Sequence, residues 1–460
     1  MKRCLLSTLV ASVLACASVT AAAQTLTLQQ VYAAARQQDA TLQAARAQAE
    51  AGREAVPQAR ARLLPNVSMN LARSKEELDS TSLGAQPVRS EREYFASSKV
   101  LSLRQPLIRA GDVVNLKQAY ARVDESEANL ERDTQNLAVR VCEAYFELLL
   151  ADEQIALVAS QRAAYTTQLA AAERGFAAGS GTRTDIDEVR ARLDLNAADE
   201  LQARQHRLVA LKQLRTMVTL PFDAVAPLDA ARFEPNAPAA AELDAWTARA
   251  AANSPELKAL QAQVKAAGLE VTKARAQHLP TLDLVANYSR NESDSIDRIG
   301  SRYNNKSVGL QLNVPLYAGG AVNSAARQAV AERSRAEAAL EALGRDLEVR
   351  VYREFSSVAE GALRIRALQQ AVRSSEQVVL SNRKSFAAGS RTTVDILNAE
   401  QQRTSAERDL AQARYLYLIA GVRLAVLAGA FDTAQLDRID RFFAIGLAKG
   451  NVSPSTARQP

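Results

Sequence analysis

Few residues in this chain of 460 have the types and spacing that enzyme chemistry requires. The two histidines, His206 and His278, are far apart and have no cysteine or second histidine at metal-ligand spacing, which argues against a metal site. The sequence also lacks the Gly-x-Ser-x-Gly of a nucleophile elbow and the Gly-Lys-Ser/Thr of a phosphate loop. These residues therefore predict neither an enzyme nor a bound cofactor.

The charged residues with the most suggestive spacing follow two similar turns. The segments are Phe176 to Ile186 (FAAGSGTRTDI) and Phe386 to Ile396 (FAAGSRTTVDI). In each, one glycine, Gly179 or Gly389, suits the left-handed conformation that ends a helix. We therefore expect two helix-turn-helix hairpins with polar residues just beyond each turn.

Arg391 and Asp395 follow the second turn and lie one helical turn apart. An arginine guanidinium can hold a carboxylate through two hydrogen bonds, so these residues could form part of a charged latch. The simpler interpretation is that Asp185 and Asp395 each stabilise a helix N-terminus, where the helix dipole favours negative charge. The sequence alone leaves both interpretations open.

The elements that position these turns are long helices. No proline occurs from Leu107 to Leu220 or from Leu316 to Ser453, and an interior proline costs a helix about 3 kcal/mol. Apolar residues recur at steps of three, four or seven, as in a coiled coil. Val113 to Ala172 would span roughly 90 Å as one helix at about 1.5 Å per residue. Cys142 should lie within this helical wall.

Four shorter stretches alternate between apolar and polar residues, as strands do. Examples are Val67, Met69 and Leu71 in the first half, and Leu282, Leu284, Ala286 and Tyr288 in the second. Polar loops, Ser74 to Arg92 and Arg290 to Arg302, are expected to join the strands. A half-buried soluble sheet and a membrane barrel with lipid outside and water inside both fit this alternation.

The N-terminus favours the barrel. Lys2 and Arg3 followed by an apolar run predict a secretory signal over residues 1–23. Lipidation at Cys16 is an alternative, although Leu14 is bulky for that cleavage site. After the signal, no run approaches about 18 consecutive apolar residues, so no membrane-spanning helix is expected. A single-chain barrel needs about eight strands, so four strands per chain predict that several chains close one barrel.

The overall composition is compatible with an extended helical protein. Apolar residues make up 47% and charged residues 23% of the chain, which excludes a disordered composition. Removing Lys2 and Arg3 lowers the formal charge from +6 to +4, and lysines and arginines do not cluster among aromatic residues. Nucleic-acid binding therefore has no support.

The chain repeats itself. Leu28 to Leu42 parallels Leu243 to Leu257, and the two glycine turns recur 210 residues apart. Each half has the order helix, two strands, long helix, turn, helix, and a proline-rich linker runs from Pro221 to Pro238. We expect a signal, a first repeat, a linker, a second repeat and a C-terminal tail, over residues 1–23, 24–220, 221–240, 241–430 and 431–460.

This pattern resembles the TolC family of outer-membrane efflux and secretion proteins. The resemblance rests on the duplication, the two glycine turns, and the junctions Pro106 to Gly111 (PLIRAG) and Pro315 to Gly320 (PLYAGG). It implies a mainly α-helical trimer in which a twelve-stranded transmembrane β-barrel continues into a long coiled-coil tunnel. A collar would draw on Pro221 to Pro238 and the segment after Ala430, with Trp246 packed in it.

The resemblance also implies roles for residues near the turns. Arg391 matches the family's gate arginine and Asp395 an entrance aspartate, with Thr184 and Asp185 as partner positions on the other hairpin. Phe386 stands where a gate tyrosine is found, so a hydrogen bond is lost. Asn398 replaces a second entrance aspartate, so cation affinity should fall.

The partners implied are outer-membrane lipid, a periplasmic adaptor that docks around Gly179 and Gly389, and an inner-membrane ABC or proton-driven transporter. No cofactor or metal is implied. Type I secretion is favoured over drug efflux because the lipidation signal is weak. A periplasmic coiled-coil adaptor or tether is the alternative of another class, and it leaves the four strands unexplained.

Overall fold

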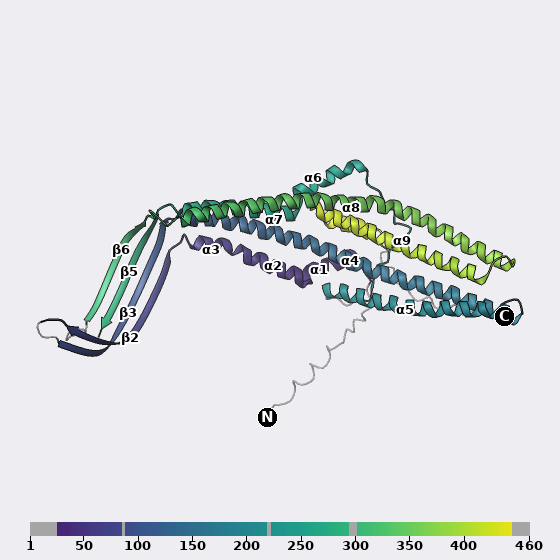
Figure 1. The fold of residues 1–460 in the computed structure, drawn as a ribbon, viewed down its shortest axis with the longest axis horizontal. Helices are drawn as coiled ribbons and strands as arrows, with labels where there is room; N and C mark the ends of the chain where they lie inside the picture. Colours follow the sequence, from purple (N-terminus) through teal and green to yellow (C-terminus); the bar gives the residue numbers. More distant parts are fainter. Residues whose placement is uncertain (1–24, 85–87, 219–221, 294–300, 444–460) are drawn as a thin grey trace, which may run out of the picture.

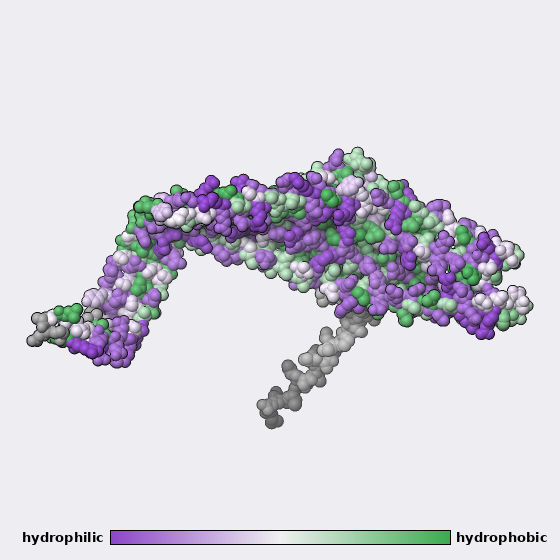
Figure 2. Space-filling model, viewed as in Figure 1, coloured by the Kyte–Doolittle hydropathy of each residue, from purple (hydrophilic) through white to green (hydrophobic). Residues whose placement is uncertain are grey.

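The computed structural model describes residues 25–84, 88–218, 222–293 and 301–443. The predicted signal at residues 1–23 and Cys16 lie outside these residues. The protein is elongated, with a sheet at one end and two long helical hairpins reaching the other (Figure 1). Polar side chains cover much of the visible face of the helical body, and hydrophobic ones gather where the sheet joins it (Figure 2).

Two very long helices run the length of the body, as the proline-free stretches predict. Helix α4 spans Ala110–Ala177 and α8 spans Ala321–Ala387. Each turns back into a shorter helix, α5 (Arg183–Met217) or α9 (Thr393–Leu427). Both pairs pack as antiparallel hairpins, and α4 also contacts α9.

Shorter helices line the half of the body next to the sheet (Figure 1). They are α1 (Leu28–Gln38), α2 (Ala40–Arg53) and α3 (Ala55–Ala61) in the first half, and α6 (Leu243–Asn253) and α7 (Pro255–Ala276) in the second. Helix α7 packs between α4 and α8. The two halves therefore show the same order of elements.

The sheet has four antiparallel strands in the order β2-β3-β5-β6. They are β2 (Asn66–Ser82), β3 (Val88–Ile108), β5 (Thr281–Ser293) and β6 (Ser301–Asn313). The strands are longer than expected: β2 and β3 pair as far as Ser82 and Val88, so most of the predicted loop from Ser74 to Arg92 is wrong. Backbone hydrogen bonds between the strands continue there although the apolar alternation stops.

The strand register aligns side chains of one kind across the sheet. Val67, Leu103, Ala286 and Val308 lie side by side in one row. The adjacent row, which faces the other side, consists of Ser68, Ser102, Asn287 and Ser307. Because side chains alternate along each strand, the sheet has one apolar face and one polar face. Neither β2 nor β6 has a second neighbour among the described strands.

A buried carboxylate ties the sheet to the helical body. Asp283 in β5 is 2% exposed and accepts hydrogen bonds from Arg104 Nη2 at 2.5 Å and Arg109 Nη2 at 2.7 Å. Arg109 is the residue before α4, and the pairing of β3 with β5 shifts register between Pro106 and Ile108. The shared aspartate thereby sets the geometry of the strand-to-helix junction.

Segments distant in sequence meet around the middle of α4. Strand β1 (Thr25–Leu26) pairs in parallel with β4 (Ala224–Val225) from the predicted linker. Helix α10 (Thr433–Asp440) packs on α1, and Leu228 bridges to Phe443. The Tyr145 hydroxyl donates to the carbonyls of Leu26 and Ala226, and Cys142 is fully buried in the same core. We call this assembly the equatorial core.

One described helix, α9, is long and apolar enough to cross a membrane by length and composition. The sequence prediction counted consecutive apolar residues and so did not identify it. Of its most apolar window, 56% is buried within the protein. Because Leu418, Ile419 and Val422 pack in the equatorial core, we attribute the apolar character to that packing.

Candidate functional site

The two hairpins end in closely similar turns at the end of the body opposite the sheet (Figure 1). Gly179 has φ +73° and Gly389 has φ +77°. Ser180 N donates to Gly175 O at 2.9 Å, and Ser390 N donates to Ser385 O at 3.0 Å. The predicted left-handed glycine turns are confirmed.

Both aspartates beyond the turns stabilise helix N-termini. Thr182 N donates to Asp185 Oδ2 at 3.1 Å, and Asp185 N donates back to Thr182 Oγ1 at 3.2 Å. Thr392 and Asp395 form the same reciprocal pair in α9. The hydrogen bond from the Thr182 hydroxyl holds the pKa of Asp185 below its usual value, and backbone and hydroxyl bonds from Thr392 do the same for the pKa of Asp395. Both aspartates are therefore ionised and ordered at neutral pH.

Arg391 contacts its own helix in the single chain. Its Nη1 lies 3.4 Å from Asp395 Oδ1, and its side chain is 54% exposed. At the matching position of the first turn stands Gly181, where an added Cβ would lie 2.9 Å from the backbone nitrogen of Phe176. A side chain at Gly181 would therefore require the first turn to shift, and only the second hairpin carries an arginine at this position.

A different arginine joins the two hairpins. Arg192 in α5 donates through Nη2 to Asn398 Oδ1 at 3.2 Å and through Nη1 to Gln401 Oε1 at 2.5 Å, both in α9. Its side chain is 25% exposed. Thr393, in α9, lies close enough to Asp185 of α5 to help lower the pKa of that carboxyl. These contacts form a polar link between the hairpins near their tips.

A small apolar cluster lies beneath the polar link. Tyr165 of α4, Val189 of α5 and Leu397 of α9 are buried together, with Leu169 and Leu193 against them. Removing this apolar area from water holds α5 and α9 at contact distance, so the side chains of Arg192 and Asn398 can meet.

The remaining predicted site residues lie at the surface. Thr184 is exposed on α5, and the Phe386 side chain is 38% exposed near the end of α8. The sequence prediction missed Arg192. A signal was present, because Arg192 follows Asp185 by seven residues and therefore lies on the same helix face.

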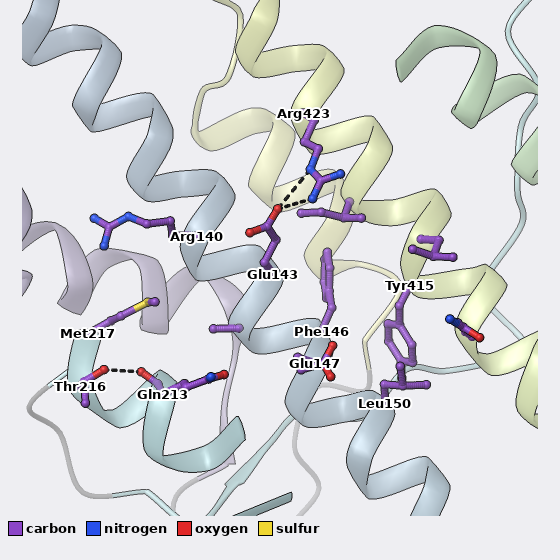
Figure 3. Close-up of a pocket in the computed structure, with 14 residues that line it drawn as sticks. Arg140, Glu143, Phe146, Glu147, Leu150, Gln213, Thr216, Met217, Tyr415 and Arg423 are labelled. Atoms are coloured by element: carbon purple, nitrogen blue, oxygen red, sulfur yellow. Dashed lines mark hydrogen bonds and ion pairs between the residues drawn. The ribbon is translucent and has the colours of Figure 1, made fainter. Parts of the chain in front are cut away.

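A groove of about 600 Å³ lies between α4, α5 and α9 beside the equatorial core (Figure 3). Phe146 and Tyr415 line it, with ring centroids 6.1 Å apart. Of its four charged lining residues, Arg140 pairs with Asp39, Glu143 and Arg423 pair with each other at 2.5 Å, and Glu147 contacts His206 Nε2 at 3.0 Å. Each of these four side chains thus contacts a neighbouring helix or segment, which favours a packing role for them.

Residues singled out individually in the sequence have packing roles. His206 Nε2 lies 3.0 Å from Glu147, and His278 Nε2 lies 3.2 Å from Asn323 Oδ1. Trp246 in α6 packs beside a second apolar cluster on α8, with the Arg249 guanidinium 4.1 Å from its ring centroid.

Comparison with known proteins agrees with this architecture. The family model described as outer membrane efflux protein matches residues 31–219 and 246–430. The chain is 36% identical to the alkaline protease secretion protein AprF of Pseudomonas aeruginosa, over 90% of this chain and 87% of that protein. It is 32% identical to the proteases secretion protein PrtF of Dickeya chrysanthemi, over 92% of each.

Among solved structures, the outer-membrane channel OprN superposes with a TM-score of 0.75 at 20% identity, over 88% of this chain and 90% of that one. That likeness shows the channel-tunnel fold. With the family match over most of the chain, it confirms the predicted resemblance and localisation, and it places the protein among export channels of the outer membrane rather than enzymes. The chain belongs to the outer membrane efflux protein family.

Proposed function

We propose that three copies of this chain form an outer-membrane exit duct for type I protein secretion. The observation that carries this proposal is the sheet, whose one apolar and one polar face are aligned over four strands and whose two edges, β2 and β6, have no second neighbour among the described strands. Unpaired backbone groups at those edges would be costly in lipid, where only closed barrels satisfy every strand.

Closure by neighbouring copies pairs each β6 with the β2 of the next chain. Three chains then give twelve strands, with Leu103 and its row facing lipid and Ser102 and its row facing water. The helical hairpins would close alongside into a tunnel. Exposed apolar residues on α5 and α8, such as Leu201 (70% exposed) and Leu363 (58% exposed), offer surface for that contact.

The tips of the hairpins form the proposed periplasmic gate. Arg391 is more than half exposed, and its one ion pair among the described residues is the exposed contact with Asp395 in its own helix, so its guanidinium could turn to Thr184 and Asp185 of the next copy. Asp185 is ionised and fixed by its cap, which makes it a suitable acceptor. Within each copy, the Arg192 link keeps the two hairpins together. Phe386 would pack at the closed tip without the hydrogen bond of a tyrosine.

The proposed partners follow from the family and the relatives. Members of this family work with a periplasmic adaptor and an inner-membrane transporter, and the turns at Gly179 and Gly389 are the surface we propose for the adaptor. AprF and PrtF are named as protease secretion proteins, which favours an ABC transporter and a protein cargo over small toxic compounds.

The equal lengths of α5 and α9 and the two separate family matches support an internal duplication, with halves at residues 24–220 and 241–430. The linker at 221–240 and the tail from 431 would then form the collar around the equatorial core, because β4 and α10 already pack there.

The test is single-channel conductance of detergent-purified protein in planar bilayers. Native protein is compared with Arg391→Ser and with Arg183→Ser as the matched control. Arg183 is also an exposed arginine near a tip, paired with Asp187 four residues later at 3.8 Å. We expect a small native conductance that rises in Arg391→Ser and stays unchanged in the control.

A pore that Arg391→Ser leaves unchanged would keep the duct and remove Arg391 from the gate. Well-folded protein that needs no detergent and never conducts would favour the periplasmic tether. Restored protease secretion in a strain lacking its own outer-membrane duct, without restored drug resistance, is the result expected for type I secretion.

A further inference from the structure

The apolar face of the sheet continues into a group of basic residues, and beyond them β2 and β3 carry mainly carboxylates on the same face (Glu77, Asp79, Glu91 and Glu93). Next to the helices this face carries residues such as Leu103 and Leu284. Farther along the strands the same face carries cations. They come from all four strands, and we call them the basic patch: Arg73, Lys99, Arg290, Arg302 and Lys306.

These cations outnumber the carboxylates beside them. Glu292 is shared by Arg290 and Arg302, each with an N–O distance of 2.6 Å. Five positive charges and one negative charge leave a net charge of +4 on the patch. In the part of the chain that the structure describes, Arg73, Lys99 and Lys306 form no ion pair with a carboxylate.

The placement of Lys99 is unfavourable for the isolated sheet. Lys99 lies directly opposite Arg290 on the same face, and like charges in that arrangement repel. Lys99 is also exposed, with Leu71 opposite it on the other neighbouring strand. A bound anion that bridges Lys99 and Arg290 would turn this repulsion into attraction.

Aromatic rings mark the level of the patch. Lys306 Nζ lies 5.8 Å from the centroid of the Tyr288 ring, and the Arg73 guanidinium lies 5.2 Å from that of Phe95. Tyrosines and other aromatic residues are enriched where a membrane protein crosses the boundary between lipid chains and headgroups. The patch therefore adjoins the apolar band at the height where headgroups begin.

We propose that the basic patch binds the phosphate groups of anionic lipids in the outer leaflet. The proposal rests on the proposed function, because only a barrel in the membrane brings headgroups to this face. A guanidinium and an ammonium that converge from neighbouring strands suit a phosphate, and the apolar band directly below holds the acyl chains of the same molecule. A free phosphate ion would gain nothing from that band.

The experiment compares two double variants that each remove two positive charges from the same face. Lys99→Gln/Lys306→Gln removes patch cations that have no carboxylate partner. Lys75→Gln/Arg89→Gln removes cations already paired with Glu93 and Asp79, both at 2.5 Å. Purified full-length protein in neutral detergent is titrated with a bisphosphorylated glycolipid, lipid A, and binding is measured by native mass spectrometry.

We expect binding at least about tenfold weaker for the patch variant and nearly unchanged for the control, since each basic residue near an anionic surface contributes roughly 1 kcal/mol. Zwitterionic phosphatidylethanolamine should bind all three proteins equally. Equal lipid A binding by both double variants would overturn the proposal. If inorganic pyrophosphate at equal concentration displaced lipid A, the patch would be a site for free phosphate groups and not for a lipid.

Failure of this proposal is distinguishable from failure of the duct. Both double variants should keep the native oligomer mass and the native conductance, because neither touches the hairpin tips. A native protein without conductance would refute the duct whatever its lipid binding. Normal conductance with charge-independent lipid binding would refute only the basic patch as a lipid site.

Discussion

Replacing Arg192 with methionine should loosen the two hairpins of each copy. Methionine keeps most of the aliphatic stem and removes the two hydrogen bonds to Asn398 and Gln401. Each such bond contributes about 0.5–1.5 kcal/mol net at a partly exposed site. The Arg192 side chain is 25% exposed, so the loss should total about 1–3 kcal/mol.

The two hydrogen bonds stabilise only those states of the channel in which the two hairpins are in contact. If opening of the entrance separates α5 from α9, the equilibrium between closed and open states should shift by about 5- to 150-fold. The assay is the open probability of single channels in planar bilayers. The measurement is made near neutral pH, where Asp185 is ionised and the cap at the start of α5 is intact.

Arg190→Met is the matched control. Arg190 lies two residues earlier on α5 and donates to Glu173 of α4 at 3.0 Å, so its bond lies within one hairpin. We expect the control to leave open probability nearly unchanged. Equal open probability in native protein and Arg192→Met would refute the reasoning, because the link would then be intact in the open state or too weak to matter.

Three further outcomes are expected. Asn398→Asp should strengthen channel block by divalent cations. The gain should be larger in an Arg192→Met background, because no guanidinium then offsets the new negative charge. Equal block of the native and variant channels would contradict this expectation. Lowering the pH should destabilise the first turn of α5, because the pKa of Asp185 is lower in the folded protein than in the unfolded chain. The ionised cap stabilises the helix above the unfolded pKa of about 3.9, and this stabilisation is lost as the pH falls through the folded pKa. Amide hydrogen exchange, corrected for intrinsic rates, should show the loss of protection, and Asp185→Asn should abolish its pH dependence. Cys142 should resist labelling by maleimide in the folded protein and react when the protein is denatured. Burial raises the pKa of its thiol and keeps the reagent away from the sulfur. Fast labelling of the native protein would show that the core opens.

The long helices and the glycine turns were predictable from local sequence. A proline-free stretch with a heptad pattern favours helix over most of the chain between Leu107 and Leu220, because the hydrogen bonds of a helix join residues four apart. The left-handed turns at Gly179 and Gly389 are likewise local, since one residue type suits that backbone conformation. For the same reason the sequence indicated caps at Asp185 and Asp395.

The ends of the strands were not predictable in this way. Apolar alternation marks a strand only where one face is buried in a core or in lipid. From Ser74 to Ser82 and from Arg89 to Arg92 the one apolar residue is Leu78, so the alternation disappears although the two strands remain paired. Pairing depends on a partner strand, and a single segment of sequence does not reveal it.

The side chains that meet across the hairpins were also decided by the tertiary structure. The sequence pointed to Arg391, which lies beside a turn, but its partner in the single chain is the local Asp395. The inter-hairpin contact belongs to Arg192, whose partner Asn398 is 206 residues away. That contact depends on how far α5 and α9 are shifted along their axes relative to each other, and the burial of Val189 against Leu397 fixes this position. Local periodicity determines which segments are helices, whereas only the packing of those helices determines which side chains face each other.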